Sequence, residues 1–276
     1  MTEFATQSLL DTETARIRDV VCQGECRHRS AAECAGATHL VFPYRGVYVR
    51  HVGRADAVAE ANQVVFFNQG EEYCVSHPVD GGDASLSIEI AAPLLHELAP
   101  KDQVVGGEAL AFRRQRLRID PRTQVLVALL RHSLREGAVE TLEAEALTLT
   151  LARRALGERT AHAAGASHGR QKLVDRAKVV LSSDLARRWT LADIADQVGV
   201  SPVYLTQVFQ QVEAVPLYRY QLRLRLARAL DLLGRYDDLT MLGLDLGFSS
   251  HSHFTASFRQ AYGRTPAEFQ RSAHLR

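Results

Sequence analysis

Two short stretches place polar side chains on helix faces that the apolar residues leave open. The first includes Gln207, whose side-chain amide can pair with adenine through two hydrogen bonds. The second includes two histidines and a serine close to a helix start. Side chains spaced in this way along one helix can read base edges in the DNA major groove. The candidate base-contacting residues are Val203, Thr206, Gln207 and Gln210, then His251, Ser252 and His253.

Each stretch is the second half of a repeated pattern. The segments Leu191–Val212 and Leu239–Tyr262 match each other, with Gly199 corresponding to Gly247. In both, an apolar helix pattern ends at the glycine, which tolerates a left-handed backbone, and a second apolar helix pattern follows. Two helices joined by a short glycine turn form a helix-turn-helix unit. The predicted caps of the second helices are Ser201, and Ser249 or Ser250.

A longer helical pattern, from about Pro216 to Leu233, lies between the two units. It carries an apolar stripe formed by Leu222, Leu226, Ala229, Leu230 and Leu233. About 17 helical residues extend about 26 Å. With the widths of the two flanking helix-turn-helix units added to this length, we expect the two reading helices to lie about 34 Å apart, one turn of DNA.

The final segment, GFSSHSHFTASFRQAYGRTPAEF, is the most specific part of the sequence. With the first unit and the linker RLRLARALDLL, it resembles the DNA-binding domain of the AraC/XylS transcription regulators. The resemblance covers about the last 106 residues, 171–276, and implies two helix-turn-helix units that enter adjacent major-groove segments. Relatives often carry arginine where this chain has Gln207 and Ala256, and glycine where it has Ala214. A base preference therefore cannot be carried over from the family.

Charge is distributed unevenly along the chain. The net charge is only +1, but residues 171–276 hold 14 basic and 10 acidic residues, whereas residues 1–170 hold 19 and 22. A basic excess in the C-terminal part is what phosphate contact requires. The phosphate-contact candidates are Ser201, Arg219, Arg223, Arg228, Ser250 and Arg259, while the family resemblance implies a structural role for Arg225.

Residues from about Cys22 to Ile90 have a different texture. Short runs of β-branched and aromatic residues, such as NQVVFFNQ and ASLSIEIA, alternate with turn signals such as Asp80–Asp83. This pattern predicts a β-sandwich or barrel. The segment resembles the cupin-like effector domain that precedes many AraC-type DNA-binding domains.

A barrel of this size can enclose a small molecule. Metal-dependent cupins show a His-x-His pair, a glutamate and a later histidine. The histidines of this segment have no such spacing, so we expect no metal, no cofactor, no catalytic residue and no enzymatic activity. The candidate ligand-pocket residues are Arg45, Tyr48, Arg50, Tyr73 and His77.

Four cysteines occur, at positions 22, 26, 34 and 74. We expect reduced, buried thiols, because the chain has no secretory signal. Cys22 and Cys26 with His28 leave zinc binding open, and they faintly resemble part of the methyl-accepting cysteine region of the Ada repair-regulators. The downstream Cys-x2-Cys of that family is missing here.

Two amphipathic helices, within about 121–156, follow the strands and form a helical hairpin. By resemblance they make a dimer interface; alternatively they cover the open side of the barrel. The stretch 157–170 is rich in small and polar residues and is expected to be a flexible linker. The predicted domains are therefore 1–156 (cupin-like), 157–170 (linker) and 171–276 (DNA-binding).

The predicted fold class is α+β, with an N-terminal cupin-like β-barrel and helical hairpin before an all-α domain with two helix-turn-helix motifs. The expected function is sequence-specific transcription regulation through double-stranded DNA, with a small-molecule effector, RNA polymerase and a second copy of the chain as partners. A metal-dependent cupin, an Ada-like methyl acceptor and a protein–protein adaptor remain as alternatives. No apolar run reaches about 18 residues and no signal peptide is seen, so a cytoplasmic protein without membrane contact is expected.

Overall fold

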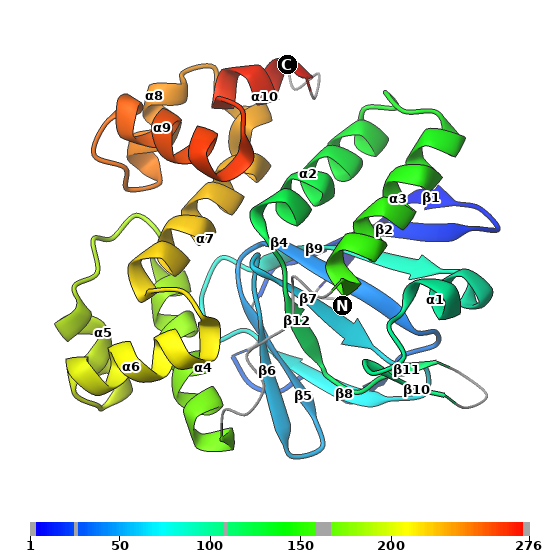
Figure 1. Ribbon diagram of the computed structural model, residues 1–276, viewed down its shortest axis with the longest axis horizontal. Coiled ribbons are helices and arrows are strands. Elements are labelled where there is room, and N and C mark those ends of the chain that lie inside the picture. The colour runs from blue at the N-terminus through cyan, green and yellow to red at the C-terminus, as the bar shows by residue number, and fades with distance from the viewer. Residues whose placement is uncertain (1–3, 25–26, 107–109, 158–166, 273–276) are drawn as a thin grey trace. The chain divides into compact units, whose positions relative to one another are not determined.

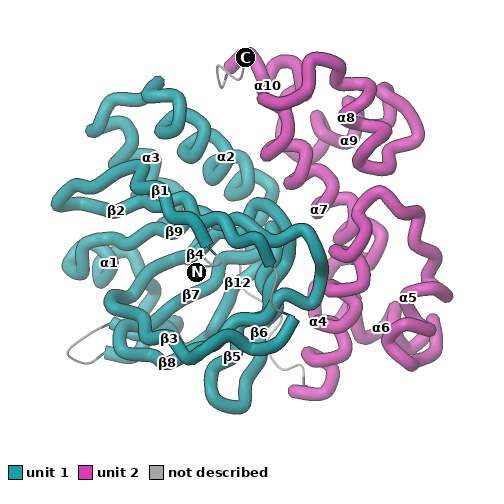
Figure 2. Tube along the Cα trace, turned by 180° about the vertical axis from the view of Figure 1, so that it is seen from behind, with its two compact units in different colours: residues 1–160 teal, residues 161–276 magenta. Residues whose placement is uncertain are grey.

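The computed structural model describes residues 4–24, 27–106, 110–157 and 167–272. Contacts divide the chain into two compact units, Met1–Thr160 and Ala161–Arg276 (Figure 2). The first unit is built on β-sheet and the second is helical (Figure 1). The predicted fold class is confirmed. None of the helices in the described ranges is long and apolar enough to cross a membrane.

The first unit contains a six-stranded sheet in the order β1-β2-β9-β4-β7-β12 and a four-stranded sheet in the order β3-β8-β5-β6. The larger sheet consists of β1 (Phe4–Asp11), β2 (Ala15–Cys22), β9 (Asp83–Ile90), β4 (His39–Arg45), β7 (Gln63–Phe67) and β12 (Arg116–Arg118). The smaller consists of β3 (Glu33–Cys34), β8 (Glu72–Ser76), β5 (Tyr48–Val52) and β6 (Ala55–Ala59). A short pair, β10 (Val104–Val105) and β11 (Ala111–Phe112), lies beside them.

The central strands β9, β4 and β7 of the larger sheet are largely buried on both faces, whereas β1 is mostly exposed. One face packs with α2 (Pro121–Arg135) and α3 (Thr141–Leu156) in the main core, to which Leu40, Leu86 and Leu151 belong. The opposite face shares a smaller core with the second sheet, which includes Val65 and Tyr48. The helix α1 (Ala92–Leu98) follows β9. The helical hairpin predicted within 121–156 is confirmed, and it packs on the sheet.

Polar contacts fix this hairpin. Asp120 caps α2 by accepting a hydrogen bond from the backbone N–H of Thr123, and it also pairs with Arg154 of α3. Burial alone would raise the pKa of Asp120, but the hydrogen bonds from Arg154 and Thr123 outweigh it and hold that pKa below its ordinary value. The start of α2 is therefore bound to the end of α3.

The second unit consists of seven α-helices within the described range 167–272. They are α4 (His168–Ser183), α5 (Leu191–Val198), α6 (Pro202–Glu213), α7 (Leu217–Leu232), α8 (Leu239–Asp245), α9 (His251–Tyr262) and α10 (Pro266–Ser272). Residues 158–166 of the predicted linker lie outside the described residues. Its last residues, 168–170, are helical, because α4 starts three residues before the predicted Gln171.

Candidate nucleic-acid interface and barrel cavity

The first helix-turn-helix unit consists of α5 and α6. Thr190 and Asp193 form a capping box at the start of α5, which satisfies two backbone N–H groups of its first turn. The helix ends at Gly199, whose φ of 70° is left-handed, as the sequence predicted. Ser201 then caps α6 by accepting a hydrogen bond from the backbone N–H of Tyr204. Local sequence signals thus determine both helix ends at this turn.

The two sides of α6 are sharply different. Leu205 and Phe209 are fully buried in the core of the unit. All four predicted base-contacting residues of α6 are exposed: Val203, Thr206, Gln207 and Gln210. The hydroxyl of Thr206 donates to the carbonyl of Pro202 and so remains tied to its own helix. The exposed face of α6 contains neither Lys nor Arg.

The second helix-turn-helix unit consists of α8 and α9. Its turn lies at Gly247, whose φ is 80°. A side-chain carbon at this position would lie 2.3 Å from the carbonyl oxygen of Ala186, so glycine is required by contact as well as by conformation. Ser250, the second of the two predicted candidates, caps α9 by accepting a hydrogen bond from the backbone N–H of His253.

One face of α9 borders a surface groove lined by His251, Ser252, Thr255, Ala256, Arg259, Gln260 and Thr265. His251 is hydrogen-bonded to Thr255 on this face. His253 does not line the groove. Its ring packs edge-on against Phe248, with the centroids 5.4 Å apart, and is hydrogen-bonded to Ser249. The two histidines therefore have different surroundings, and the groove adds Thr255 and Gln260 to the residues singled out from the sequence.

The phosphate-contact candidates also differ in their surroundings. Arg219 and Arg259 are exposed. Arg228 forms an ion pair with the buried Asp231, and Arg223 is half-buried. Ser201 and Ser250 use their oxygens as caps, which leaves each hydroxyl proton able to donate to a phosphate. Among these arginines, Arg219 and Arg259 are thus the most open to solvent.

Arg225 connects the two helix-turn-helix units. Its guanidinium donates to the carbonyl oxygens of Leu185 at 2.6 Å, Arg187 at 2.9 Å and Gly247 at 3.0 Å. The first two carbonyls precede α5, and the third lies in the turn between α8 and α9. Burial lowers the pKa of Arg225, but an arginine keeps its charge at physiological pH. The structural role implied for Arg225 fits these contacts.

A cavity of about 330 Å³ lies between strands of the two sheets in the first unit. Tyr48, Tyr73 and His77, three of the five predicted pocket residues, line it. Arg45 and Arg50 are not among its lining residues. The Arg50 side chain is fully buried, pairs with Glu71 and lies 4.3 Å from the centroid of the Phe67 ring. Arg50 is therefore part of the packing.

Burial raises the pKa of both tyrosines in this cavity. For Tyr73, the hydrogen bond that its hydroxyl donates to Glu33 raises the pKa further. Both hydroxyls therefore keep their protons at physiological pH. Val41 and Phe67 give the cavity an apolar part. Apolar walls with a few fixed polar groups are typical of small-molecule sites.

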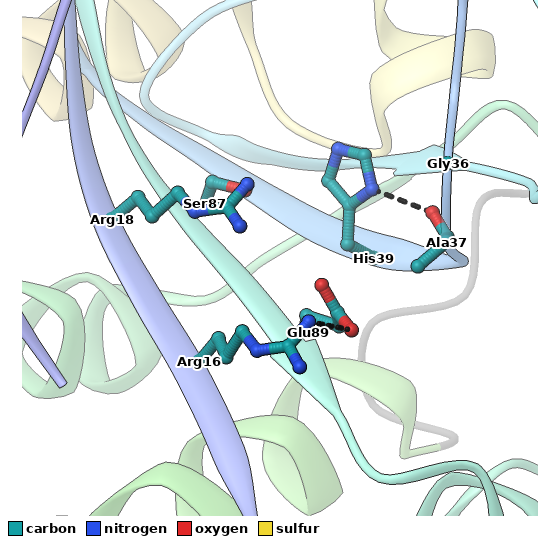
Figure 3. Close-up of a pocket in the computed structure, with 7 residues that line it drawn as sticks. All are labelled: Arg16, Arg18, Gly36, Ala37, His39, Ser87 and Glu89. Atoms are coloured by element: carbon teal, nitrogen blue, oxygen red, sulfur yellow. Dashed lines mark hydrogen bonds and ion pairs between the residues drawn. The ribbon is translucent and has the colours of Figure 1, made fainter. Parts of the chain in front are cut away.

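A second hollow, of about 390 Å³, shares residues with this cavity (Figure 3). Arg16 and Arg18 of β2 lie opposite Ser87 and Glu89 of β9, and Arg16 pairs with Glu89 at 3.1 Å. Burial lowers the pKa of His39, which also borders the hollow, so its imidazole is neutral at pH 7. Arg16 and Arg18 were not among the predicted pocket residues, because strands were predicted only from about Cys22 onward.

The 330 Å³ cavity, which Tyr48 and Tyr73 line, also brings together Cys22, His77 and Asp83. Each of these residues offers one metal-ligand atom, and the three atoms lie within 4.8 Å of one another. Of the zinc candidates named from the sequence, His28 is exposed and Cys26 lies outside the described residues. The three clustered residues are far apart in sequence, so no local spacing could have revealed them.

Comparison with known proteins agrees with this geometry. Residues 194–272 match a family described as a helix-turn-helix domain. The transcriptional activator FapR of Escherichia coli is 31% identical over 97 residues, which are 35% of this chain and 37% of FapR. The regulator GadX of Escherichia coli O6:H1 is 34% identical over 96 residues, 34% of this chain and 35% of GadX. The chain thus spans about a third of the length of these curated relatives.

A solved structure from Chromobacterium violaceum, a transcriptional regulator of the AraC-type DNA-binding group, is 31% identical. The match covers 39% of this chain and 96% of that one, with a TM-score of 0.37. The paired units and the family match define the C-terminal part as a double helix-turn-helix domain. In this domain the chain is similar to bacterial transcription regulators such as FapR and GadX.

Proposed function

We propose that this protein is a sequence-specific transcription regulator that binds double-stranded DNA through α6 and α9. The observation that carries the proposal is the pairing of two equivalent helix-turn-helix units on one connecting helix. Each unit buries the apolar side of its second helix and leaves a polar side exposed. In such units the second helix lies in the major groove.

The connecting helix α7 has 16 residues and therefore extends about 24 Å. Arg225 holds backbone from both units and would preserve their relative orientation on DNA. Base reading is assigned to the exposed faces of the two helices, with Thr255 and Gln260 added to the α9 set and His253 at its edge. Arg219 and Arg259 would fix the register by contacting phosphates.

The two units should contribute unequally to DNA binding. The groove on α9 contains Arg259, whereas the exposed face of α6 has no cation of its own. Phosphate neutralisation supplies much of the affinity of a DNA-binding protein. The second helix-turn-helix unit, α8 and α9, is therefore expected to contribute more of the DNA-binding free energy than the first.

The cavity of the first unit is the proposed effector site. A small molecule that contacts the Tyr48 hydroxyl and the apolar walls could change DNA affinity only if it binds one state of the protein better than another. The hairpin of α2 and α3 is the proposed homodimer contact, and Leu142, 78% exposed on α3, lies on it. RNA polymerase is the proposed partner on the promoter, and a chromosomal target would place the protein in the cytoplasm. No enzymatic activity is proposed.

Genomic DNA selection with the purified full-length protein, at physiological salt and followed by sequencing, tests this proposal. Two conserved blocks about ten base pairs apart are expected. His251→Ala should weaken binding to the selected site more than Gln207→Ala does. His168→Ala, an exposed histidine on α4, is the matched control and should leave the affinity unchanged.

The bare face of α6 also favours a second candidate, an adaptor that contacts another protein instead of DNA. The two functions differ in their dependence on salt. A DNA reader loses affinity steeply as salt rises, with a slope that corresponds to several neutralised phosphates. If the selection enriches no sequence and binding shows no such salt dependence, DNA reading is refuted and the adaptor function remains.

A further inference from the structure

Cys22 of β2 and Asp83 of β9 lie next to each other on neighbouring strands, and both line the cavity. They are directly paired in the antiparallel register of β2 and β9, which lie side by side in Figure 1. Side chains paired in this way have Cβ atoms about 4.5–5.5 Å apart. His77 follows the end of β8 directly and brings its Nε2 to 2.8 Å from Oδ2 of Asp83. Three separate elements thus bring a sulfur, a nitrogen and an oxygen to one point.

Glycine packing fixes the backbone around this point. A side-chain carbon at Gly82 would lie 2.1 Å from the carbonyl oxygen of Cys22. One at Gly46 would lie 2.1 Å from the carbonyl oxygen of Gly82, and one at Gly24 would lie 2.6 Å from its Cα. Only glycines permit these approaches. The two strand ends that carry Cys22 and Asp83 are therefore held against each other by close backbone contacts.

We propose that Cys22, His77 and Asp83 bind a divalent cation of the zinc class. A thiolate, a neutral imidazole and a carboxylate carry a combined charge of about −2, which balances such an ion. All three residues also line the cavity, so a fourth coordination position faces its interior. Three protein ligands and one open position are typical of zinc sites that bind a water molecule or a small ligand.

The arrangement is close to what coordination needs. Zinc bonds of about 2.0–2.3 Å in a tetrahedron place ligand atoms roughly 3.3–3.6 Å apart. The three ligand atoms lie within 4.8 Å of one another, and the 2.8 Å contact between His77 and Asp83 need widen only slightly. On binding, the Cys22 thiol releases its proton, and the imidazole carries its single proton on the nitrogen that does not face the metal. The set is unlike the His-x-His, glutamate and histidine set of metal-dependent cupins.

Two of the three proposed ligands, His77 and Asp83, are buried, and Cys22 is half-buried. His77 is 3% exposed and Asp83 is 7% exposed. Buried ionisable groups are stabilised by pairing or by metal coordination. Cys34 lines the same cavity but is exposed and is not part of the cluster. It therefore offers a matched control for a cysteine effect.

The test uses metal-free full-length protein, with Zn²⁺ and Co²⁺ as probes. Elemental analysis after equilibration with Zn²⁺ should find one zinc per chain, and Co²⁺ should give thiolate-to-cobalt absorption in the near ultraviolet. Cys22→Ser, His77→Gln and Asp83→Asn should each lower zinc affinity at least tenfold, since even residues that only support metal ligands contribute about 10–100-fold. Cys34→Ser should bind as the unmodified chain does.

Circular dichroism melting of each variant checks that it is folded. As a second readout on the unmodified chain, Zn²⁺ should slow alkylation of Cys22 by iodoacetamide and leave that of Cys34 unchanged. The absence of stoichiometric zinc would overturn the proposal. So would zinc binding that persists in folded His77→Gln but is lost in Cys26→Ser, or Cys22 alkylation at the same rate with and without Zn²⁺. None of these readouts involves DNA, so the proposed transcriptional function is tested separately.

Discussion

A fully buried ion pair joins α4 to α6. The Nζ of Lys178 lies 2.7 Å from Oε1 of Glu213, and neither side chain has any exposure to solvent. Glu213 is the last residue of α6, so the pair holds the end of that helix. Lys178→Met removes the cation, keeps a side chain of similar length and leaves the carboxylate buried. We predict that this single change destabilises the second unit strongly.

The magnitude follows from what the carboxylate would have to do. In water a glutamate has a pKa of about 4.3, so protonating one at pH 7 costs about 3.7 kcal/mol. Protonation is one way for Glu213 to stay buried without its partner. Breaking a buried pair by removing one member generally costs about 3–5 kcal/mol, which agrees with this value. The double variant Lys178→Met with Glu213→Leu removes both charges and should cost much less than Lys178→Met alone.

The chain contains a single tryptophan, which makes the assay specific. Trp189 packs against the core of the second unit, and its indole N–H donates to the carbonyl of Asp184. Urea unfolding followed by tryptophan fluorescence therefore reports on the unit that contains the ion pair. The penalty of Lys178→Met should be about 2 kcal/mol smaller at pH 5.5 than at pH 7, because protonating the remaining carboxylate is then easier.

Two results would refute this reasoning. A penalty below about 1 kcal/mol at pH 7 would mean that the carboxylate is not desolvated in the variant. A double variant as unstable as the sum of the two single variants would mean that the side chains contribute through packing and not through their mutual attraction. If the folded Lys178→Met variant has the same tryptophan fluorescence as the unmodified protein, a local effect of the substitution on Trp189 is ruled out.

Three further predictions concern the backbone and its supports. Ala214→Gly should stabilise the second unit by up to about 1 kcal/mol in the same urea assay, since Ala214 has a φ of 52°, the only positive φ of a non-glycine residue among those described. Arg225→Lys should destabilise that unit by about 2–3 kcal/mol, because lysine cannot donate to three carbonyls in a fork; an unchanged midpoint would contradict the bridging role. The first unit should become less stable as the pH drops below 3.8, the ordinary pKa of an aspartate. The pKa of Asp120 is lowered in the folded protein, so its ionised carboxylate stabilises the fold above that pH, and this stabilisation is lost as the carboxyl is protonated. Circular dichroism melting across this range should show a smaller pH dependence in Asp120→Asn.

Local signals in the sequence predicted the second unit well. The glycine turns at Gly199 and Gly247, the cap at Ser201 and the buried phenylalanines are determined by neighbouring residues and by helical periodicity. The buried pair of Lys178 and Glu213 was not predicted. Its residues are 35 positions apart, and a lysine or a glutamate on a helix is ordinarily expected to be exposed to solvent.

The first unit was predicted less completely. Two strands, Phe4–Asp11 and Ala15–Cys22, precede the segment in which strands were expected. The second of them buries Ala15, Ile17 and Asp19 on one face and exposes arginines on the other, so a charged residue, Asp19, interrupts the apolar side of the alternation. The cavity and the cluster with Cys22 depend on which strands become neighbours, and the sequence carries no local mark of that pairing.

The first helix-turn-helix unit differs at several positions from the transcription regulators that it resembles. Its helix ends are capped and its core is closed, so the unit is structurally intact. Yet α6 lacks a cation, and its C-terminal residue is held by a buried ion pair with Lys178. Arg225 ties this unit to the turn of the second. An intact unit without a cation, joined to one whose groove contains Arg259, would add sequence discrimination but little non-specific affinity, because phosphate contacts strengthen binding to every sequence alike.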